Sequence, residues 1–182
     1  MEPAHMTPPH RAVFFDRDGV VNISPGAGYV TTWESFHFSP GIIDALRLCK
    51  ERGYLTVLVT SQQGVGKGIM SQADLDDIHA QMQTRLQNEN ACFDGIYACT
   101  HLAGTCTCRK PSAEMIHNAV KDLHIDTAQS LLIGDHDRDI QMAHNASIPI
   151  TIRIRGEKEI TVSATTTLDS TTELRAALAQ LL

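Results

Sequence analysis

Short apolar runs alternate with segments of helical periodicity along most of the chain. The runs lie at residues 12–15, 54–59, 95–98, 130–133 and 148–154. They are uninterrupted and rich in β-branched and aromatic residues, as is typical of strands that are buried on both faces. Because such strands alternate with helices, we predict an α/β fold with one doubly wound, Rossmann-like parallel sheet and helices on both of its faces.

The helical segments fill the intervals between these runs and the end of the chain. Five segments carry apolar residues at helical spacing: three begin after Pro40, Ser71 and Ser112, and two cover about residues 138–146 and 170–182. The first is expected to stop at Gly53. The threonine-rich residues 161–172 predict an edge strand and a turn before the last helix.

A single domain is expected at residues 12–182, after a flexible N-terminal leader at residues 1–11. A chain of 182 residues with 42% hydrophobic residues is long enough to bury one sizeable core. The helical segments are short and leave no room for a large cap domain. The pocket should therefore be shallow or covered by loops, and open to small substrates.

Charge and hydropathy narrow the range of partners. The net charge is -6 and the basic residues are scattered, which argues against a nucleic-acid surface and favours a small partner. There is no apolar run of about 18 residues, and the N-terminus lacks the apolar stretch of a secretory signal. We therefore predict a cytoplasmic protein without membrane attachment; its oligomeric state stays open, and a monomer is compatible with the sequence.

Three polar residues directly follow predicted strands: Asp16, Thr60 and Asp135. In open α/β sheets the ligand lies outside the carboxyl ends of the strands, so these positions are candidate site residues. If the backbone stays extended, Asp16 and Asp18 point to the same side and Arg17 points away. Their mutual repulsion would be relieved by a divalent cation that Asp135 also holds, and oxygen ligands of this kind suit Mg²⁺.

This arrangement fits phosphoryl transfer. One carboxylate can accept a phosphoryl group while a second protonates the leaving alkoxide and then deprotonates the attacking water. The Thr60 hydroxyl and the Lys110 amino group could stabilise the phosphoryl oxygens. Taken alone, an Asp-x-Asp pair after a strand is more often a turn or a helix cap. Lys67 in "GVGKG" lacks the glycine spacing and the following Ser or Thr of a phosphate-binding loop.

Residues 99–108 predict a second site, for zinc. The stretch "CTHLAGTCTC" contains four candidate ligands: Cys99, His101, Cys106 and Cys108. Four such ligands close a tetrahedral site and leave no open position, so the zinc would be structural rather than catalytic. The alternative is a mobile loop with free thiols. Cys49 and Cys92 are expected to belong to the packing.

Four motifs, "FFDRDGVVN", "VLVTSQQG", "CRKP" and "IGDHDRD", occur in this order, and with them the sequence resembles the haloacid-dehalogenase superfamily of phosphatases. The zinc loop resembles that of the subgroup that acts on heptose bisphosphate or histidinol phosphate, and "GYVTTWESFHFSPGIIDAL" is more similar to the heptose enzymes. The resemblance implies Mg²⁺-dependent hydrolysis of a phosphorylated sugar through an aspartyl phosphate, at the 7-position of heptose 1,7-bisphosphate; histidinol phosphate is the alternative substrate.

The resemblance also implies a role for each matching residue. Asp16 would be the nucleophile and Asp18 the general acid and base. The side chains of Asp16 and Asp135 and the carbonyl of Asp18 would hold Mg²⁺, with Asp139 in support. The implied substrate-binding residues are Gly28, Tyr29, Thr60, Ser61, Gln62, Gln63, Arg109, Lys110 and His136, with Arg109 at the distal part of the substrate.

Three positions depart from the family pattern. Ser61 and Gln63 stand where Asn and Ser are common, and His136 stands where a Lys or Arg usually follows the motif Asp. A neutral His136 would attract phosphate less and make activity more sensitive to pH. A signalling receiver domain is a competing interpretation, but receivers place their paired acids side by side and have no zinc loop. A zinc-stapled binding protein without catalysis is a further alternative.

Overall fold

The computed structural model describes residues 8–182, and its centre is one sheet of six strands. The strands are β1 (Ala12–Phe15), β2 (Leu55–Ser61), β3 (Gly95–Cys99), β4 (Leu131–Gly134), β5 (Ile150–Ile154) and β6 (Thr166–Leu168). Their spatial order is β3-β2-β1-β4-β5-β6, and every neighbouring pair is parallel. The predicted fold class is confirmed, including the edge strand in the threonine-rich segment.

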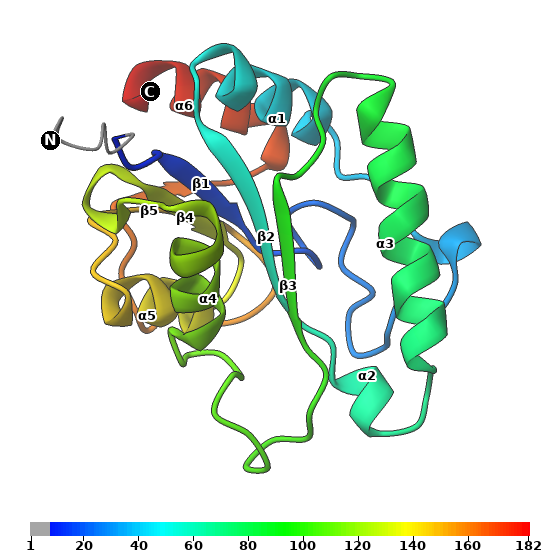
Figure 1. The fold of residues 1–182 in the computed structure, drawn as a ribbon. Helices are drawn as coiled ribbons and strands as arrows, with labels where there is room; N and C mark the ends of the chain where they lie inside the picture. The colour runs from blue at the N-terminus through cyan, green and yellow to red at the C-terminus, as the bar shows by residue number, and fades with distance from the viewer. Residues whose placement is uncertain (1–7) are drawn as a thin grey trace, which may run out of the picture.

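In the described part of the chain, six α-helices connect or follow these strands (Figure 1). They are α1 (Ile42–Glu51), α2 (Gln63–Gly66), α3 (Gln72–Gln87), α4 (Glu114–Leu123), α5 (Asp137–Asn145) and α6 (Leu174–Leu181). Short 3-10 helices lie at Trp33–Ser35, Thr127–Gln129 and Thr171–Glu173. The sequence did not predict α2, because four residues are too few to show a helical period.

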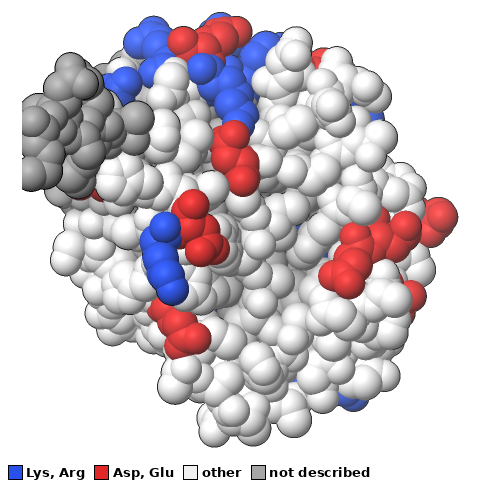
Figure 2. Space-filling model, in the orientation of Figure 1, with Lys and Arg blue, Asp and Glu red and all other residues white. Residues whose placement is uncertain are grey.

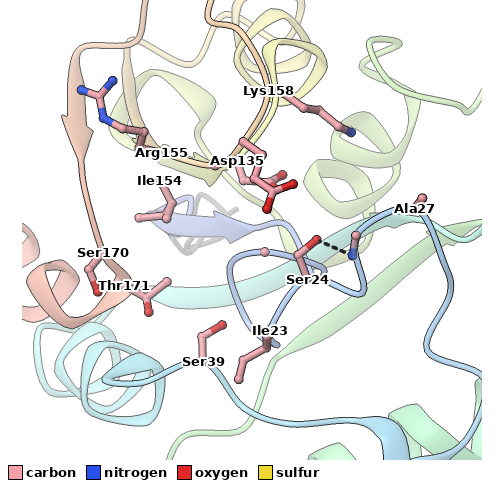
Figure 3. A pocket seen from close by; sticks show the side chains of 14 residues that line it. Ile23, Ser24, Ala27, Ser39, Asp135, Ile154, Arg155, Lys158, Ser170 and Thr171 are labelled. Atoms are coloured by element: carbon pink, nitrogen blue, oxygen red, sulfur yellow. Dashed lines mark hydrogen bonds between the residues drawn. The ribbon is translucent and has the colours of Figure 1, made fainter.

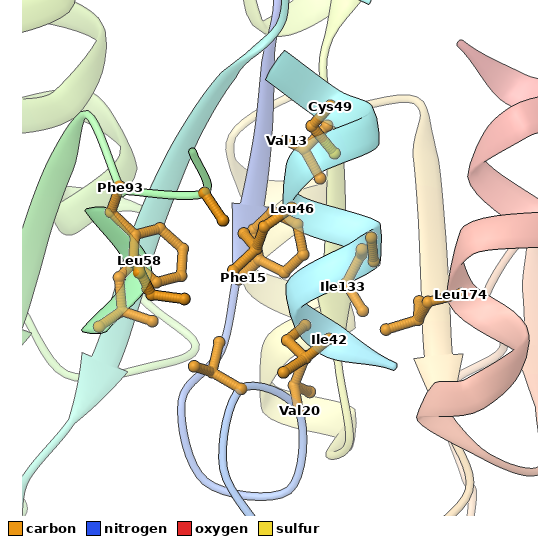
Figure 4. Packing of buried hydrophobic residues seen from close by; sticks show 14 of the residues in the cluster. Val13, Phe15, Val20, Ile42, Leu46, Cys49, Leu58, Phe93, Ile133 and Leu174 are labelled. Atoms are coloured by element: carbon orange, nitrogen blue, oxygen red, sulfur yellow. The ribbon is translucent and has the colours of Figure 1, made fainter. Parts of the chain in front are cut away.

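The two faces of β1 explain why its sequence is continuously apolar. Val13 and Phe15 pack in a cluster with residues of α1, α3 and α6, among them Ile42 and Leu46 (Figure 4). The alternate residues, Ala12 and Phe14, pack in a second cluster with residues of α4 and α5. Since successive strand side chains point to opposite faces, a strand covered on both sides must be apolar throughout.

The register of the sheet aligns the carboxyl ends of its central strands. Phe15, the last residue of β1, pairs with Leu58 of β2 and with Ile133 of β4. The chain winds outward from β1 in both directions, so the strand order reverses between β1 and β4. This is the position at which open α/β sheets form a ligand crevice, and the residues after β1 and β4 lie there.

The N-terminal segment, the helix lengths and the surface charges bear on the other predictions. The predicted leader falls largely outside the described residues, but His10 bridges to Ile125 beside the sheet. Within the described chain no helix is long and apolar enough to cross a membrane, and no separate cap domain interrupts the fold. On the face in Figure 2, acidic and basic side chains form small separate groups with uncharged surface between them.

Candidate active site

Two acidic residues face each other across the reversal in strand order. Asp16 follows β1, and its backbone N–H donates to the Ile133 carbonyl at 2.9 Å, so it continues the sheet by one residue. Asp135 directly follows β4. Gly19, with φ +89°, packs against Asp135, and a Cβ atom on it would lie 2.2 Å from Oδ2 of Asp135. Only glycine allows this turn to approach the Asp135 carboxylate so closely.

Lys110 connects Asp16 to a third acidic residue, Asp139. Its amino group donates to Oδ1 of Asp16 at 2.6 Å and to Oδ1 of Asp139 at 2.7 Å, and all three residues are buried. Oδ2 of Asp139 accepts hydrogen bonds from the backbone N–H groups of Asp135 and His136. Asp139 therefore holds the lysine with one oxygen and the start of α5 with the other.

The site carries more negative charge than its lysine can neutralise. Ligand oxygens of Asp16, Asp135 and Asp139 all lie within 4.8 Å of one another. Burial, followed by the charge of Asp139, raises the pKa of Asp16 well above its ordinary value and that of Asp135 to about 6. Burial opposes the charge on Lys110, but the charges of Asp139 and Asp16 prevail and raise its pKa. Buried acids that repel one another fit a site for a hard divalent cation.

The carboxylate of Asp18 lies in a different environment from those three acids. It accepts from Nη2 of Arg17 at 3.1 Å, from the Asn22 amide at 2.9 Å and from the Gln62 amide at 3.0 Å. The expectation that Arg17 points away from Asp18 is wrong. The backbone leaves the extended conformation at this point, because the Arg17 carbonyl accepts from the N–H groups of residues 20, 21 and 22 in a tight turn.

The last residues of β2 and the residue that follows it supply polar groups beside this carboxylate. Thr60 and Gln62 are both buried, and the Gln62 amide donates to the Thr60 hydroxyl at 2.8 Å as well as to Asp18. The hydroxyl of Ser61 is buried and has no hydrogen-bond partner among the described residues. A buried hydroxyl without a hydrogen-bond partner destabilises the fold unless a ligand supplies the partner. The Ser61 hydroxyl is therefore available to hydrogen-bond a ligand.

A cavity of about 130 Å³ joins these groups. Nine residues predicted for the site line it: Asp16, Asp18, Gly28, Tyr29, Ser61, Lys110, Asp135, His136 and Asp139. Thr60 and Gln62 lie buried next to it, whereas Gln63 and Arg109 do not line it. One guanidinium nitrogen of Arg109, Nη1, is buried and has no hydrogen-bond partner in residues 8–182.

Sequence reasoning missed five lining residues: Ser24, Pro25, Gly26, Arg138 and Lys158. Lys158 follows β5, so the rule that ligands lie outside the carboxyl ends of strands could have found it. The residues on the loop after β1 show no comparable signal, because their position depends on how that loop folds back over the strand ends.

His136 is the N-cap of α5. Its Nδ1 accepts from the backbone N–H of Arg138 at 3.1 Å, which requires an unprotonated Nδ1. Burial, followed by the charge of Arg138, lowers the pKa of His136. The imidazole is therefore neutral at physiological pH, and it can offer its Nε2–H to the cavity as a donor but not as a cation.

The four predicted zinc ligands lie together at the end of β3 and in the loop that leads to α4. Sγ of Cys99 is 3.5 Å from Sγ of Cys106 and 2.7 Å from Sγ of Cys108, and Nδ1 of His101 is 3.4 Å from Sγ of Cys108. All four ligand atoms lie within 4.8 Å of one another. Three sulfur atoms and one imidazole nitrogen at this spacing fit a four-coordinate zinc ion. Cys49, by contrast, is buried in the core beside β1.

Comparisons with known proteins agree with this geometry. Residues 29–152 match the family described as haloacid dehalogenase-like hydrolase. The D-glycero-beta-D-manno-heptose-1,7-bisphosphate 7-phosphatase of Haemophilus influenzae is 36% identical over 159 residues, which cover 84% of this chain and 85% of that protein. The enzyme of the same name from Escherichia coli strain K12 is 36% identical over 166 residues, 87% of this chain and 86% of its own length.

A solved structure resembles most of the chain as well. The D,D-heptose 1,7-bisphosphate phosphatase of B. bronchiseptica, crystallised with magnesium and phosphate, superposes with a TM-score of 0.81 at 25% sequence identity. The match covers 94% of this chain and 99% of that one. The family match, the similar sequences, the fold and the acidic site at the strand reversal are consistent with one another. The chain belongs to the haloacid dehalogenase-like hydrolase family.

Proposed function

We propose that the protein is a Mg²⁺-dependent phosphatase that removes the 7-phosphate of D-glycero-D-manno-heptose 1,7-bisphosphate and leaves the 1-phosphate. Its class, phosphoric monoester hydrolase, agrees with the family and with the named relatives. The observation that carries the proposal is the position of Lys110, which holds Asp16 and Asp139 beside Asp135 at the strand reversal. A cytoplasmic location and a small phosphorylated sugar as partner belong to the same proposal.

The two acids after β1 divide the chemistry between them. A carboxylate oxygen of Asp16 attacks phosphorus, the bond from phosphorus to the sugar oxygen breaks, and Asp18 gives that oxygen a proton. Asp18 then takes a proton from water, which attacks the aspartyl phosphate, releases inorganic phosphate and regenerates Asp16. The contacts of Asp18 with Arg17, Asn22 and Gln62 keep it apart from the lysine that binds the nucleophile, so each carboxylate has its own partners.

Donors around the cavity would hold the phosphoryl oxygens. Lys110 supplies a cation, and the hydroxyls of Thr60 and Ser61 supply hydrogen bonds, so the developing charge meets groups that are already in place. His136 would add a neutral donor. Gly28 and Tyr29 would shape the entrance to the cavity, while Gln63 and Arg109 would contact the more distant parts of the substrate.

Two metal sites belong to the proposal. Asp16 and Asp135, with the Asp18 carbonyl, would hold Mg²⁺, and Asp139 would support that site from behind; the ion supplies positive charge that neutralises the acids and the phosphate. The raised pKa values of Asp16 and Asp135 support a cation there. Cys99, His101, Cys106 and Cys108 would hold Zn²⁺, whose part is to fix the loop that leads to Arg109 and Lys110.

Steady-state kinetics on heptose 1,7-bisphosphate and on histidinol phosphate, with Mg²⁺ and with a chelator, tests the proposal. We expect phosphate release that depends on Mg²⁺, with the higher kcat/KM for heptose bisphosphate. A higher kcat/KM for histidinol phosphate would replace the substrate and keep the reaction. If the protein released no phosphate from any monoester in the presence of Mg²⁺, the proposed function would be wrong.

A further inference from the structure

The cavity of about 130 Å³ at the acidic site has mostly negative walls. Its acidic lining residues are Asp16, Asp18, Asp135 and Asp139. Lys110 is already engaged, because its amino group donates to Asp16 and to Asp139. His136 adds no charge, since its Nδ1 accepts a hydrogen bond as the N-cap of α5. A phosphate dianion in this cavity would therefore be bound more tightly if a further cation faced it.

Lys158 is a cation at this cavity that has no partner of its own. In residues 8–182 it makes no ion pair and no hydrogen bond. It lines the smaller cavity and also a larger one of about 630 Å³, where it and Arg155 extend in opposite directions (Figure 3). After burial and other charges, the charge of Lys158 also lowers the pKa of Asp135 and of His136, which places it beside both.

The loop that carries Lys158 is fixed at its start. After β5, the backbone N–H of Arg155 donates to the Leu168 carbonyl at 2.8 Å, and Nε of Arg155 donates to Oδ1 of Asp169 at 2.7 Å. Residues 156–160 make no hydrogen bond within the described chain. The position of Lys158 therefore depends on where the loop is held next.

Asp137, the first residue of α5, holds the far end of this loop. Its Oδ2 accepts from the backbone N–H of Thr161 at 3.1 Å and from the Thr161 hydroxyl, and its Oδ1 accepts from the backbone N–H of Val162 at 3.2 Å. Nη1 of Arg153 in β5 donates to the same Oδ1, and the Arg153 side chain is only 1% exposed. A buried guanidinium needs such a partner, so Arg153 fixes the carboxylate that holds the loop.

We propose that Lys158 binds the transferring phosphoryl group in the smaller cavity and that Asp137 is the positioning residue that keeps Lys158 there. The inference rests on the proposed phosphatase function and adds to it a cation from the loop after β5. Asp135 and Asp137 belong to one segment, so the loop is held relative to an acid of the site itself. A lysine suits this task, because its amino group is a compact charge on a long side chain that reaches a phosphate from the edge of a cavity.

Lys158→Ala tests the contact with the reacting phosphoryl group. For p-nitrophenyl phosphate, which carries a single phosphate, kcat/KM at saturating Mg²⁺ should fall by about tenfold, the effect of one charge-assisted hydrogen bond. Heptose 1,7-bisphosphate should lose the same factor, and Lys158→Arg should recover most of it. Lys121→Ala removes an exposed lysine of α4 and should change neither value. A loss confined to the bisphosphate would overturn the proposal.

Inorganic phosphate probes the same position without turnover. Isothermal titration calorimetry in the presence of Mg²⁺ should show that Lys158→Ala raises the Kd of inorganic phosphate by about tenfold. Arg138→Ala removes another cation that lines the smaller cavity and should raise this Kd less. An equal rise in both variants would indicate a general effect of positive charge, and an unchanged Kd in Lys158→Ala would exclude the contact; either result would overturn the proposal.

The positioning role of Asp137 needs a variant that still folds. Replacing Asp137 alone would leave Arg153 buried without a partner, whereas apolar replacement of a whole buried ion pair is often neutral for stability. The double variant Asp137→Leu, Arg153→Met should therefore fold and should raise the Kd of inorganic phosphate as Lys158→Ala does. Combined with Lys158→Ala it should cause no further rise, because both changes remove the same contact. Additive losses, or an unchanged Kd in the double variant, would contradict the role of Asp137.

Thr161→Val is a milder test of the same anchor. Thr161 is exposed, and the change removes its hydroxyl contact with Asp137 while the backbone contact stays. We expect the Kd of inorganic phosphate to rise by about threefold. Thr84→Val, at an exposed threonine of α3 whose hydroxyl donates to the Ala80 carbonyl, is the matched control and should not change it. An equal Kd in these two variants would contradict the anchor, whereas failure of the wild-type protein to hydrolyse any phosphate monoester would contradict the proposed function instead.

Discussion

Nη1 of Arg17 lies 3.3 Å from Nε2 of His79, and both residues are buried. The same guanidinium contacts the Asp18 carboxylate through Nε and Nη2. His79 comes from α3, far along the chain, and its Nε2 can accept from the guanidinium only while it is unprotonated. A helix from another part of the sequence thus completes the environment of the proposed general acid and base.

The position of His79 predicts how stability depends on pH. Burial, followed by the charge of Arg17, lowers its pKa from 6.5 to about 4. Between these values the unfolded chain binds a proton that the folded chain does not, so the free energy of unfolding falls as pH drops from about 6.5 toward 4. The loss approaches about 3 kcal/mol at the low end. Urea unfolding from pH 7 to pH 4.5 measures it, and His79→Gln should reduce this slope; an equal slope in the variant would contradict the assignment.

The paired contacts of Arg17 predict a defect in proton transfer. Arg17→Lys keeps the charge but cannot reach both Asp18 and His79, so Asp18 loses its fixed orientation. We expect kcat to fall about ten- to a hundredfold with little change in KM, because misplacing a reacting group by a fraction of an ångström is costly. Arg47→Lys, at an arginine that bridges Asp44 and Glu89 far from the site, is the control. An unchanged kcat in Arg17→Lys would show that Asp18 needs no such support.

Asp16→Asn should abolish Mg²⁺-dependent phosphate release without loss of the fold. An amide cannot accept the phosphoryl group, but Lys110 keeps its contact with Asp139. Because burial and the charge of Asp139 raise the pKa of Asp16, its ionised form destabilises the metal-free protein at neutral pH. The variant should therefore melt no lower than the wild type in chelator, while Mg²⁺ should raise its Tm less. Full turnover by this variant would refute the nucleophile assignment.

Gly19→Ala tests whether the turn after Asp16 positions Asp135. The added Cβ would lie 2.2 Å from Oδ2 of Asp135, so the carboxylate must move away. We expect a stability loss of about 1–2 kcal/mol from the left-handed backbone together with at least a tenfold higher Mg²⁺ concentration for half-maximal activity. Gly53→Ala has the same kind of backbone, with φ +74°, but no atom within 4 Å of the new Cβ. It should lose stability and keep its Mg²⁺ dependence; equal Mg²⁺ dependence in both variants would contradict the prediction.

Cys106→Ser tests the zinc site. Three remaining ligands should bind zinc more weakly, and elemental analysis should find less than one zinc per chain. A loss of about 2 kcal/mol would lower Tm by roughly 4–8 °C in a chain of this size. Cys92→Ser, at a cysteine outside the cluster, should keep its zinc. If purified wild-type protein contained no zinc and Cys106→Ser melted at the wild-type temperature, the predicted zinc site would be wrong.

Much of the fold could be predicted because each strand carries its own signal. β1 is continuously apolar over four residues and β4 over three, as expected of strands that lie between two helical layers. The element boundaries differ by a few residues: the last helix begins at Leu174 rather than near residue 170, because the capped 3-10 turn Thr171–Glu173 precedes it. The four-residue α2 left no periodic signal at all.

The sequence by itself determined the fold class, the acids at the ends of β1 and β4, and the cluster of four candidate zinc ligands, since each depends on residues that are close in the chain or on strand ends that must meet. Only the tertiary structure decided that Arg17 turns toward Asp18 and His79, that Asp139 shares Lys110 with Asp16, and that Lys158 joins two cavities. These contacts depend on how loops fold back over the sheet and on which helix packs beside them. Local periodicity carries no information about such long-range contacts.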